Sequence, residues 1–170
     1  DLGFNTTIGL DTVEFNEGTF KKTLLNIICW GTGYQMICTV PDKSAKSAKE
    51  AYAKHWVRYF GHPELVITDQ GTEFTGAPFP QYVAEGGTLQ HLIDSQSPWQ
   101  NGRTERAGGS FKEDLRDIIS ELGIVTELEF EEAITAAMDA RNRFPNRSGF
   151  SAHQRVFGSE IRLPGTMLTD

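Results

Sequence analysis

Three short segments near the start of the chain are dominated by apolar and β-branched side chains. They cover residues 6–15 (TTIGLDTVEF), 23–31 (TLLNIICWG) and 34–40 (YQMICTV). Runs of this length and composition are typical of β-strands. Because only a few residues separate the segments, we expect three consecutive strands joined by tight turns as an antiparallel meander.

The next apolar side chains recur every three or four residues instead of every two. This helical spacing, which predicts an amphipathic helix, is set by Ala45, Ala48, Tyr52, Trp56 and Tyr59. Ser44 is a suitable N-cap, and Gly61 with the following Pro63 ends the helix.

Short strands and helices then alternate. The pattern predicts a strand at 64–68 (ELVIT), a loop at 69–74, a short helix at 79–86, a strand at 88–93 and a polar loop at 94–101. Two longer helices follow over about 102–121 and about 126–143. Thr126 and Glu129 have the spacing of a capping box at the start of the second one.

The C-terminal tail, about 145–170, is interrupted by proline and glycine and has room for one short helix near 151–157. No internal repeat, low-complexity tract or linker divides the chain. We therefore expect residues 1–170 to form a single domain of the α/β class.

The chain has a formal net charge of −7. An isolated DNA-binding domain is usually basic, so this charge argues against a function that rests on DNA binding alone. Two circumstances weaken that objection. Bound metal ions neutralise carboxylates, and basic groups can cluster on one surface or on other domains.

Two cysteines, Cys29 and Cys38, lie in apolar segments. We expect buried, reduced thiols, because Cys is among the residue types most often buried, and this indicates a reducing compartment. No segment approaches the roughly 20 apolar residues of a membrane span, and the first residues lack the features of a signal peptide. We therefore expect no contact with a membrane.

Asp11 lies inside the first predicted strand, on the same face as Gly9, Val13 and Phe15. A carboxylate among inward-facing apolar residues is costly unless it is paired or binds a metal. The alternative is a position at the edge of the sheet, where Asp11 would meet solvent.

Asp69 and Glu105 have equally ordinary explanations when each is taken alone. Asp69 directly follows a predicted strand, at the end where α/β domains bind ligands, but Asp-Gln-Gly is also a good turn sequence. Glu105 lies in the first turns of a predicted helix, where the helix dipole alone favours an acidic residue.

The three acidic residues are more informative together. Asp11 precedes Asp69 by 58 positions, and 35 residues separate Asp69 from Glu105. The predicted order of strand, loop and helix brings all three to one crevice. Carboxylates without a histidine cluster suit Mg²⁺ or Mn²⁺ better than Zn²⁺, and two such ions can promote phosphoryl transfer.

The segments around these residues resemble the catalytic core of retroviral and LTR-retrotransposon integrases. They are IGLDTVEF, VITDQGTEF and SPWQNGRTER, with further similarity at KHWVRYFGHPELVITD and FSAHQRVFG. The similarity covers nearly the whole chain. It implies an RNase H-like fold, with a five-stranded mixed sheet and helices on both faces.

The resemblance also implies a chemistry. Integrases are polynucleotidyl transferases: water attacks a phosphodiester near the end of the element's DNA, and the freed 3′-hydroxyl attacks target DNA. Asp11, Asp69 and Glu105 match the family's three metal ligands, which hold Mg²⁺ or Mn²⁺, with two ions in the active complex.

Several polar residues near Glu105 match the family's mobile loop or lie on the basic side of the following helix. We expect DNA contacts from Gln96, Gln100, Asn101, Arg103, Arg106 and Lys112. Lys112 follows Glu105 by seven residues and lies on the same helix face, although a solvated surface lysine is the alternative. Trp99 is expected either to stack on a base or to pin the loop by packing.

The resemblance sets the expected partners as well. They are the DNA ends of the element, target DNA and further copies of the chain, with action in the nucleus or in a cytoplasmic particle. The zinc module and basic barrel that flank this core in the family are not in the sequence, so we interpret the chain as one piece of a longer polyprotein. The alternatives are a silent DNA-binding or dimerisation module, or a related transposase or nuclease.

Overall fold

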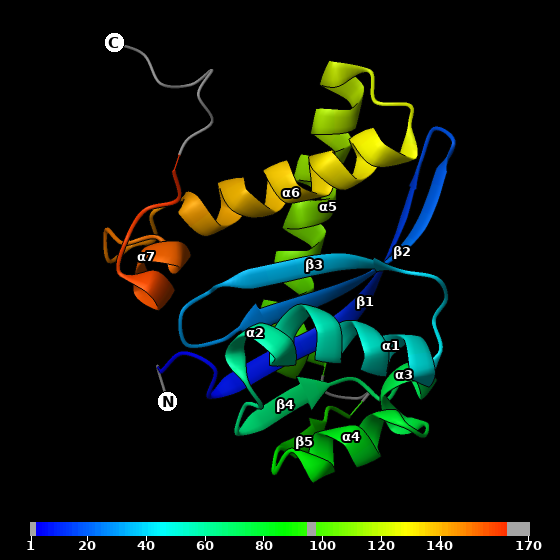
Figure 1. Ribbon diagram of the computed structural model, residues 1–170, viewed down its shortest axis with the longest axis vertical. Helices are drawn as coiled ribbons and strands as arrows, with labels where there is room; N and C mark the ends of the chain where they lie inside the picture. The colour runs from blue at the N-terminus through cyan, green and yellow to red at the C-terminus, as the bar shows by residue number, and fades with distance from the viewer. Residues whose placement is uncertain (1–2, 95–97, 163–170) are drawn as a thin grey trace.

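One mixed β-sheet forms the centre of the molecule. The computed structural model describes residues 3–94 and 98–162. The strands are β1 (Thr7–Glu17), β2 (Phe20–Cys29), β3 (Gln35–Val40), β4 (Leu65–Thr68) and β5 (Leu89–Leu92). Their order is β3-β2-β1-β4-β5, with β1–β2 and β2–β3 antiparallel and β1–β4 and β4–β5 parallel (Figure 1). The predicted five-stranded mixed sheet and its initial meander are thus confirmed.

The helices lie where the sequence predicts them, with two additions. They are α1 (Ala45–Tyr52), the π-helical η1 (Ala53–Val57), α2 (Arg58–Phe60), α3 (Thr72–Thr75), α4 (Phe79–Glu85), the 3₁₀ turn η2 (Pro98–Asn101), α5 (Gly102–Leu122), α6 (Glu127–Arg143) and α7 (Ala152–Phe157). The additions, α3 and η2, fall in segments predicted as loops. A single turn is too short to leave a hydrophobic period in the sequence.

Local hydrogen bonds set the predicted helix ends. The Ser44 side chain accepts from the backbone N–H of Ser47, and Gly61 follows α2 with φ of 81°. At the start of α6, Thr126 Oγ1 accepts from Glu129 N at 3.1 Å and Thr126 N donates to Glu129 Oε1 at 3.1 Å. The predicted capping box is therefore present.

A separate hydrophobic core covers each face of the sheet, because successive side chains of a strand point to opposite faces. Ile8 and Leu10 of β1 pack with Trp56 and the residues of α1. Phe15 packs on the other face with apolar residues of α5 and α6, including Phe130. Helices therefore cover both faces, as predicted, and α1 and α5 lie on opposite sides of β1 (Figure 1).

Two glycines allow α5 to lie close to β1. A Cβ atom on Gly9 would stand 2.0 Å from Thr104 Oγ1 and 2.7 Å from Trp30 Nε1. A Cβ atom on Gly108 would stand 3.1 Å from both Asn26 Nδ2 and Val13 Cγ2. This close approach places the start of α5, which carries Glu105, over the part of β1 that carries Asp11.

Both cysteines are buried and free, as the sequence predicts. Burial raises the pKa of the Cys38 thiol to about 12, so this thiol stays protonated at neutral pH. In the part of the chain that the structure describes, every helix falls short of the length and apolar character needed to cross a bilayer.

Candidate active site

Asp11 lies on the central strand of the sheet and is only 9% exposed. β2 pairs with β1 at Asp11, whereas the pairing with β4 covers Thr7, Ile8 and Gly9 and ends before it. Because Asp11 is buried all the same, the alternative interpretation of a solvent-facing edge residue is wrong. Asn26 of β2 lies opposite Asp11 in the antiparallel register, and its Nδ2 donates to Asp11 Oδ1 at 2.8 Å. The fold thus buries a carboxylate and gives it one directed hydrogen bond.

The pKa of Asp11 is raised from 3.8 to about 7. Burial is the largest cause, because it disfavours the charged form. The Asn26 hydrogen bond opposes that effect, while the negative charges of Glu105 and Asp69 raise the pKa further. Glu105 and Asp69 are therefore near enough to Asp11 for their negative charges to act on it.

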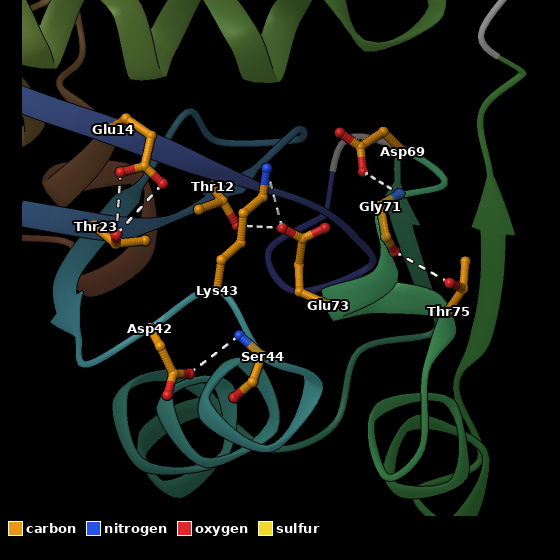
Figure 2. Close-up of polar contacts among 10 residues, drawn as sticks. All are labelled: Thr12, Glu14, Thr23, Asp42, Lys43, Ser44, Asp69, Gly71, Glu73 and Thr75. Atoms are coloured by element: carbon orange, nitrogen blue, oxygen red, sulfur yellow. Dashed lines mark hydrogen bonds and ion pairs between the residues drawn. The ribbon is translucent and has the colours of Figure 1, made fainter.

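Asp69 directly follows β4, at the carboxyl end of a parallel strand. Its Oδ1 accepts from the backbone N–H of Gly71 at 2.8 Å, and its side chain is exposed (Figure 2). Asp69 thus makes the turn that its sequence favours and also lies at the predicted strand end. The two interpretations of this residue are compatible.

Glu105 is exposed in the first turn of α5. The residue before it is fixed by two long-range hydrogen bonds: Trp30 Nε1 donates to Thr104 Oγ1 at 3.0 Å, and Asn26 Nδ2 donates to the Thr104 carbonyl at 3.1 Å. The backbone that carries Glu105 is therefore held against β1 and β2, while the Glu105 side chain is free of the core.

The donor set suits a hard divalent cation, since carboxylate oxygens are the protein ligands that Mg²⁺ and Mn²⁺ prefer. Across residues 3–94 and 98–162, however, no three His, Cys, Asp or Glu side chains lie close enough together to enclose an ion. Asp69 is turned toward Gly71 and Glu105 is exposed. Asp69 and Glu105 thus act on the pKa of Asp11 without forming a coordination shell with it.

Glu73 is a buried carboxylate beside this site that sequence reasoning missed. It is 2% exposed, and its Oε2 accepts from Thr12 Oγ1 at 3.2 Å and lies 3.6 Å from Lys43 Nζ (Figure 2). A Cβ atom on Gly71 would meet Glu73 Oε1 at 1.8 Å and Asp69 Oδ1 at 2.9 Å. Gly71 therefore allows the carboxylates of Asp69 and Glu73 to approach the same turn.

No local signal identifies Glu73 in the sequence. It lies in the quoted segment VITDQGTEF, but a Glu beside a turn usually faces solvent. Its burial depends on Lys43 and on Thr12, which is 61 positions away. Only the tertiary fold brings α3 beside Thr12 of β1 and beside Lys43, which precedes α1.

The residues predicted to contact DNA have different surroundings. Gln96 lies outside the described residues. Gln100, Arg103 and Arg106 are exposed, and Lys112 is half-buried. Asn101 is 2% exposed, and its amide oxygen and nitrogen have no hydrogen-bond partner within residues 3–94 and 98–162. The Trp99 side chain is 74% exposed, so it is not packed into a core.

The chain is similar in sequence to proteins of mobile elements and viruses, although no protein-family model matches it. It is 30% identical over 89 residues to an uncharacterised 31.7 kDa protein of insertion element IS407 from Burkholderia multivorans, covering 45% of this chain and 32% of that protein. It is 22% identical over 125 residues to the Pro-Pol polyprotein of simian foamy virus type 1, covering 73% of this chain and 10% of the polyprotein. The chain therefore spans about a third or less of these relatives.

Solved structures show the fold more fully. A chain of the simian T-cell lymphotropic virus intasome, solved in complex with the PP2A regulatory subunit B56 gamma, superposes with a TM-score of 0.83 at 17% identity, over 96% of this chain and 58% of that one. The HTLV-2 integrase catalytic core domain, solved with magnesium, superposes with a TM-score of 0.76 at 18% identity, over 90% and 97% of the two chains. This chain has the fold of a retroviral integrase catalytic core.

Proposed function

We propose that this chain is the catalytic core of an integrase-type polynucleotidyl transferase, in which Asp11, Asp69 and Glu105 hold divalent metal ions. The observation that carries the proposal is Asp11 itself. It is buried on the central strand of an integrase-core fold, and the charges of Asp69 and Glu105 raise its pKa. A buried carboxylate surrounded by like charges is costly for a fold unless a cation joins it.

Each part of the site has a distinct task in this proposal. Asp11 is the preoriented ligand, because Asn26 fixes one of its oxygens. Asp69 and Glu105 approach from the turn after β4 and from the first turn of α5. When bound, Mg²⁺ or Mn²⁺ ions would activate the attacking oxygen and stabilise the leaving oxygen of the phosphodiester.

The proposed substrates are the DNA ends of a mobile element and target DNA, cut and then joined by attack of a 3′-hydroxyl. Arg103 and Arg106 flank Glu105 on α5, and Lys112 lies about two turns further along; all three would contact DNA phosphates. We also propose that the chain acts as a homo-oligomer, alongside further domains and in the nucleus. The HTLV-2 integrase core has been solved with magnesium in both dimeric and trimeric forms.

The test uses Asp69→Asn and Glu105→Gln in the 170-residue chain, assayed for Mn²⁺-dependent cleavage and joining of a branched DNA. We expect each variant to lose more than about 100-fold in rate while keeping its circular dichroism spectrum, because each removes a proposed metal ligand. Glu113→Gln, at an exposed position of the same helix, is the matched control and should keep full activity. Activity in either ligand variant contradicts the proposed site.

The similarity to an insertion element protein favours a second candidate, a transposase of the same fold. An RNase H-type nuclease would instead prefer an RNA–DNA hybrid. Comparing DNA duplex, branched DNA and hybrid substrates separates these activities. A folded chain that binds metal but acts on none of the three substrates would be the silent DNA-binding or dimerisation module.

A further inference from the structure

A continuous chain of side-chain hydrogen bonds joins Asp11 to Arg141 on α6. Asn26 Nδ2 donates to Asp11 Oδ1 at 2.8 Å, and Asn26 Oδ1 accepts from Gln35 Nε2 at 2.7 Å. Gln35 Oε1 in turn accepts from Arg141 Nε at 2.8 Å. This chain of hydrogen bonds crosses β1, β2 and β3 and ends at the half-buried Arg141.

The two amides in this chain are nearly free of contact with water. Asn26 is 0% and Gln35 is 2% exposed. Burying an amide is unfavourable unless its polar atoms are paired, yet these two amides lie in β2 and β3, whose other buried residues are apolar. Apolar residues of similar volume would stabilise a purely structural core as well. The free energy lost by burying these polar groups therefore indicates another role for them.

All the donors point in the same direction. Each N–H group is directed toward Asp11, from the guanidinium cation through two amides to the carboxylate. Hydrogen bonds aligned in this way polarise one another and strengthen each other in a low-dielectric interior. The alignment also fixes which atom of each amide is oxygen, because an inverted amide would place two donors or two acceptors face to face.

Further contacts hold both ends of this chain of hydrogen bonds in place. At the α6 end, Arg141 Nη1 lies 3.5 Å from Asp114 Oδ2. Next to Arg141, Asn142 holds the Gln35 backbone from both sides: its Oδ1 accepts from Gln35 N at 2.9 Å, and its Nδ2 donates to Gln35 O at 2.8 Å. Gln35 therefore has little freedom to turn away from Asn26.

At the site end, Asn26 uses its second N–H to hold α5. Its Nδ2 donates to the Thr104 carbonyl at 3.1 Å as well as to Asp11 Oδ1. One buried amide thereby sets the spacing between Asp11 and the helix turn that carries Glu105. The amide nitrogen can do this only while Gln35 occupies its oxygen and holds its plane.

We propose that Asn26, Gln35 and Arg141 are positioning residues that hold Asp11 and the start of α5 in the geometry that binds the divalent metal. None of the three residues touches the reacting atoms. They act through Asp11 and through the Thr104 carbonyl. This inference rests on the proposed function, since it assigns the chain of hydrogen bonds to the same metal site.

The test measures Mn²⁺ binding to the DNA-free, 170-residue chain by calorimetry, together with the metal concentration that gives half-maximal joining activity. Residues that orient metal ligands typically contribute about 10- to 100-fold in metal affinity. We expect Asn26→Leu to weaken Mn²⁺ binding by about that range, and Arg141→Gln by about 3- to 10-fold. Saturating metal should restore most of the activity of Arg141→Gln.

Two controls separate positioning from structural support. Arg141→Lys keeps a cation and a donor for Gln35 and should bind Mn²⁺ nearly as the unsubstituted chain does. Arg143→Gln removes a half-buried arginine from the same end of α6 and should leave Mn²⁺ affinity unchanged. If Asn26→Leu does not fold, Arg141→Gln alone decides the question, because its side chain lies at the outer end of the chain of hydrogen bonds.

The outcomes distinguish this inference from the proposed function. If Asp11→Asn binds Mn²⁺ as tightly as the unsubstituted chain, the proposed metal site is wrong. If Asp11→Asn loses binding while folded Asn26→Leu and Arg141→Gln keep the original affinity, the proposed site stands and the positioning role is overturned.

Discussion

Burial of the Asp11 side chain lowers the stability of the folded chain when Asp11 is ionised, although the proposed metal binding needs the ionised form. Its carboxylate is 9% exposed, and burial raises its pKa to about 7. Without a cation, ionising this group costs free energy of folding. The hydrogen bond from Asn26 offsets only part of that cost, and a bound cation, as in the proposed function, would offset more of it.

We expect Asp11→Asn to be more stable than the unsubstituted chain when metal is absent. The folded-state pKa lies above the unfolded value of 3.8, so the folded protein loses stability as pH rises from that value to about 7 and then levels off. Asparagine keeps an oxygen for the Asn26 hydrogen bond but carries no charge. The gain should reach on the order of 2 to 4 kcal/mol at about pH 8, measured by urea unfolding in EDTA.

The same variant should lose the response to metal. Millimolar Mg²⁺ or Mn²⁺ should raise the melting temperature of the unsubstituted chain, because the ions bind only the folded carboxylates, and should leave Asp11→Asn almost unchanged. Glu113→Gln is the control for the pH effect, since Glu113 is exposed on α5 and is not among the groups that shift the pKa of Asp11. An Asp11→Asn stability gain that is equal at about pH 4 and about pH 8 would contradict the argument.

At the scale of the elements, the approach of α5 to β1 sets the position of Glu105 relative to Asp11. Gly108 faces β1, where an added Cβ would stand 3.1 Å from Asn26 Nδ2 and from Val13 Cγ2. Gly109, one residue later in the helix, has nothing within 4 Å of an added Cβ. Two adjacent glycines of the same helix thus differ in whether the space beside them is filled.

This difference gives a matched pair of substitutions. Gly109→Ala should stabilise the chain by about 0.5 to 1 kcal/mol, because alanine favours the helix and meets no other atom. Gly108→Ala should gain less than that or lose stability, since the methyl group presses on Asn26 and Val13. It should also reduce joining activity, whereas Gly109→Ala should not. Urea unfolding measures the stability of each variant, and the branched-DNA assay measures its joining activity. Equal changes in Gly108→Ala and Gly109→Ala would argue against a constrained contact between α5 and β1.

At the scale of the whole molecule, a net charge of −7 is combined with a proposed DNA substrate. The proposed site concentrates negative charge around Asp11, while exposed Arg103 and Arg106 lie beside Glu105 on α5. We expect the isolated chain to bind DNA weakly, with an affinity that depends on divalent metal and falls steeply with salt.

The salt dependence tests which basic surface contacts DNA. Arg103→Gln combined with Arg106→Gln should lower the slope of log affinity against log salt by about two, because each phosphate contact contributes close to one. The control is Lys46→Gln combined with Lys54→Gln, which changes the net charge equally at exposed positions of α1 and η1. An equal loss of slope in both double variants would indicate a general charge effect and not a contact surface on α5.

The sequence by itself determined most of the elements, because their signals are local. Strand and helix periods, the Ser44 cap and the capping box of Thr126 and Glu129 depend on residues within a few positions of one another, and the structure has them where they were predicted. The spacing of Asp11, Asp69 and Glu105, with the segments around them, was also sufficient to indicate an integrase-type core. Short turns such as α3 escaped prediction because they contain too few residues to show a period.

Only the tertiary structure decided the surroundings of these residues. It placed Asp11 on the central strand and not at an edge, buried Glu73 beside Lys43, and aligned Asn26, Gln35 and Arg141 into one chain of hydrogen bonds. Gln35 and Arg141 are 106 positions apart in the sequence. Such pairs leave no local pattern, because their hydrogen bonds exist only after the sheet and both of its helical layers have packed, and the cost of burying their polar groups is offset only there.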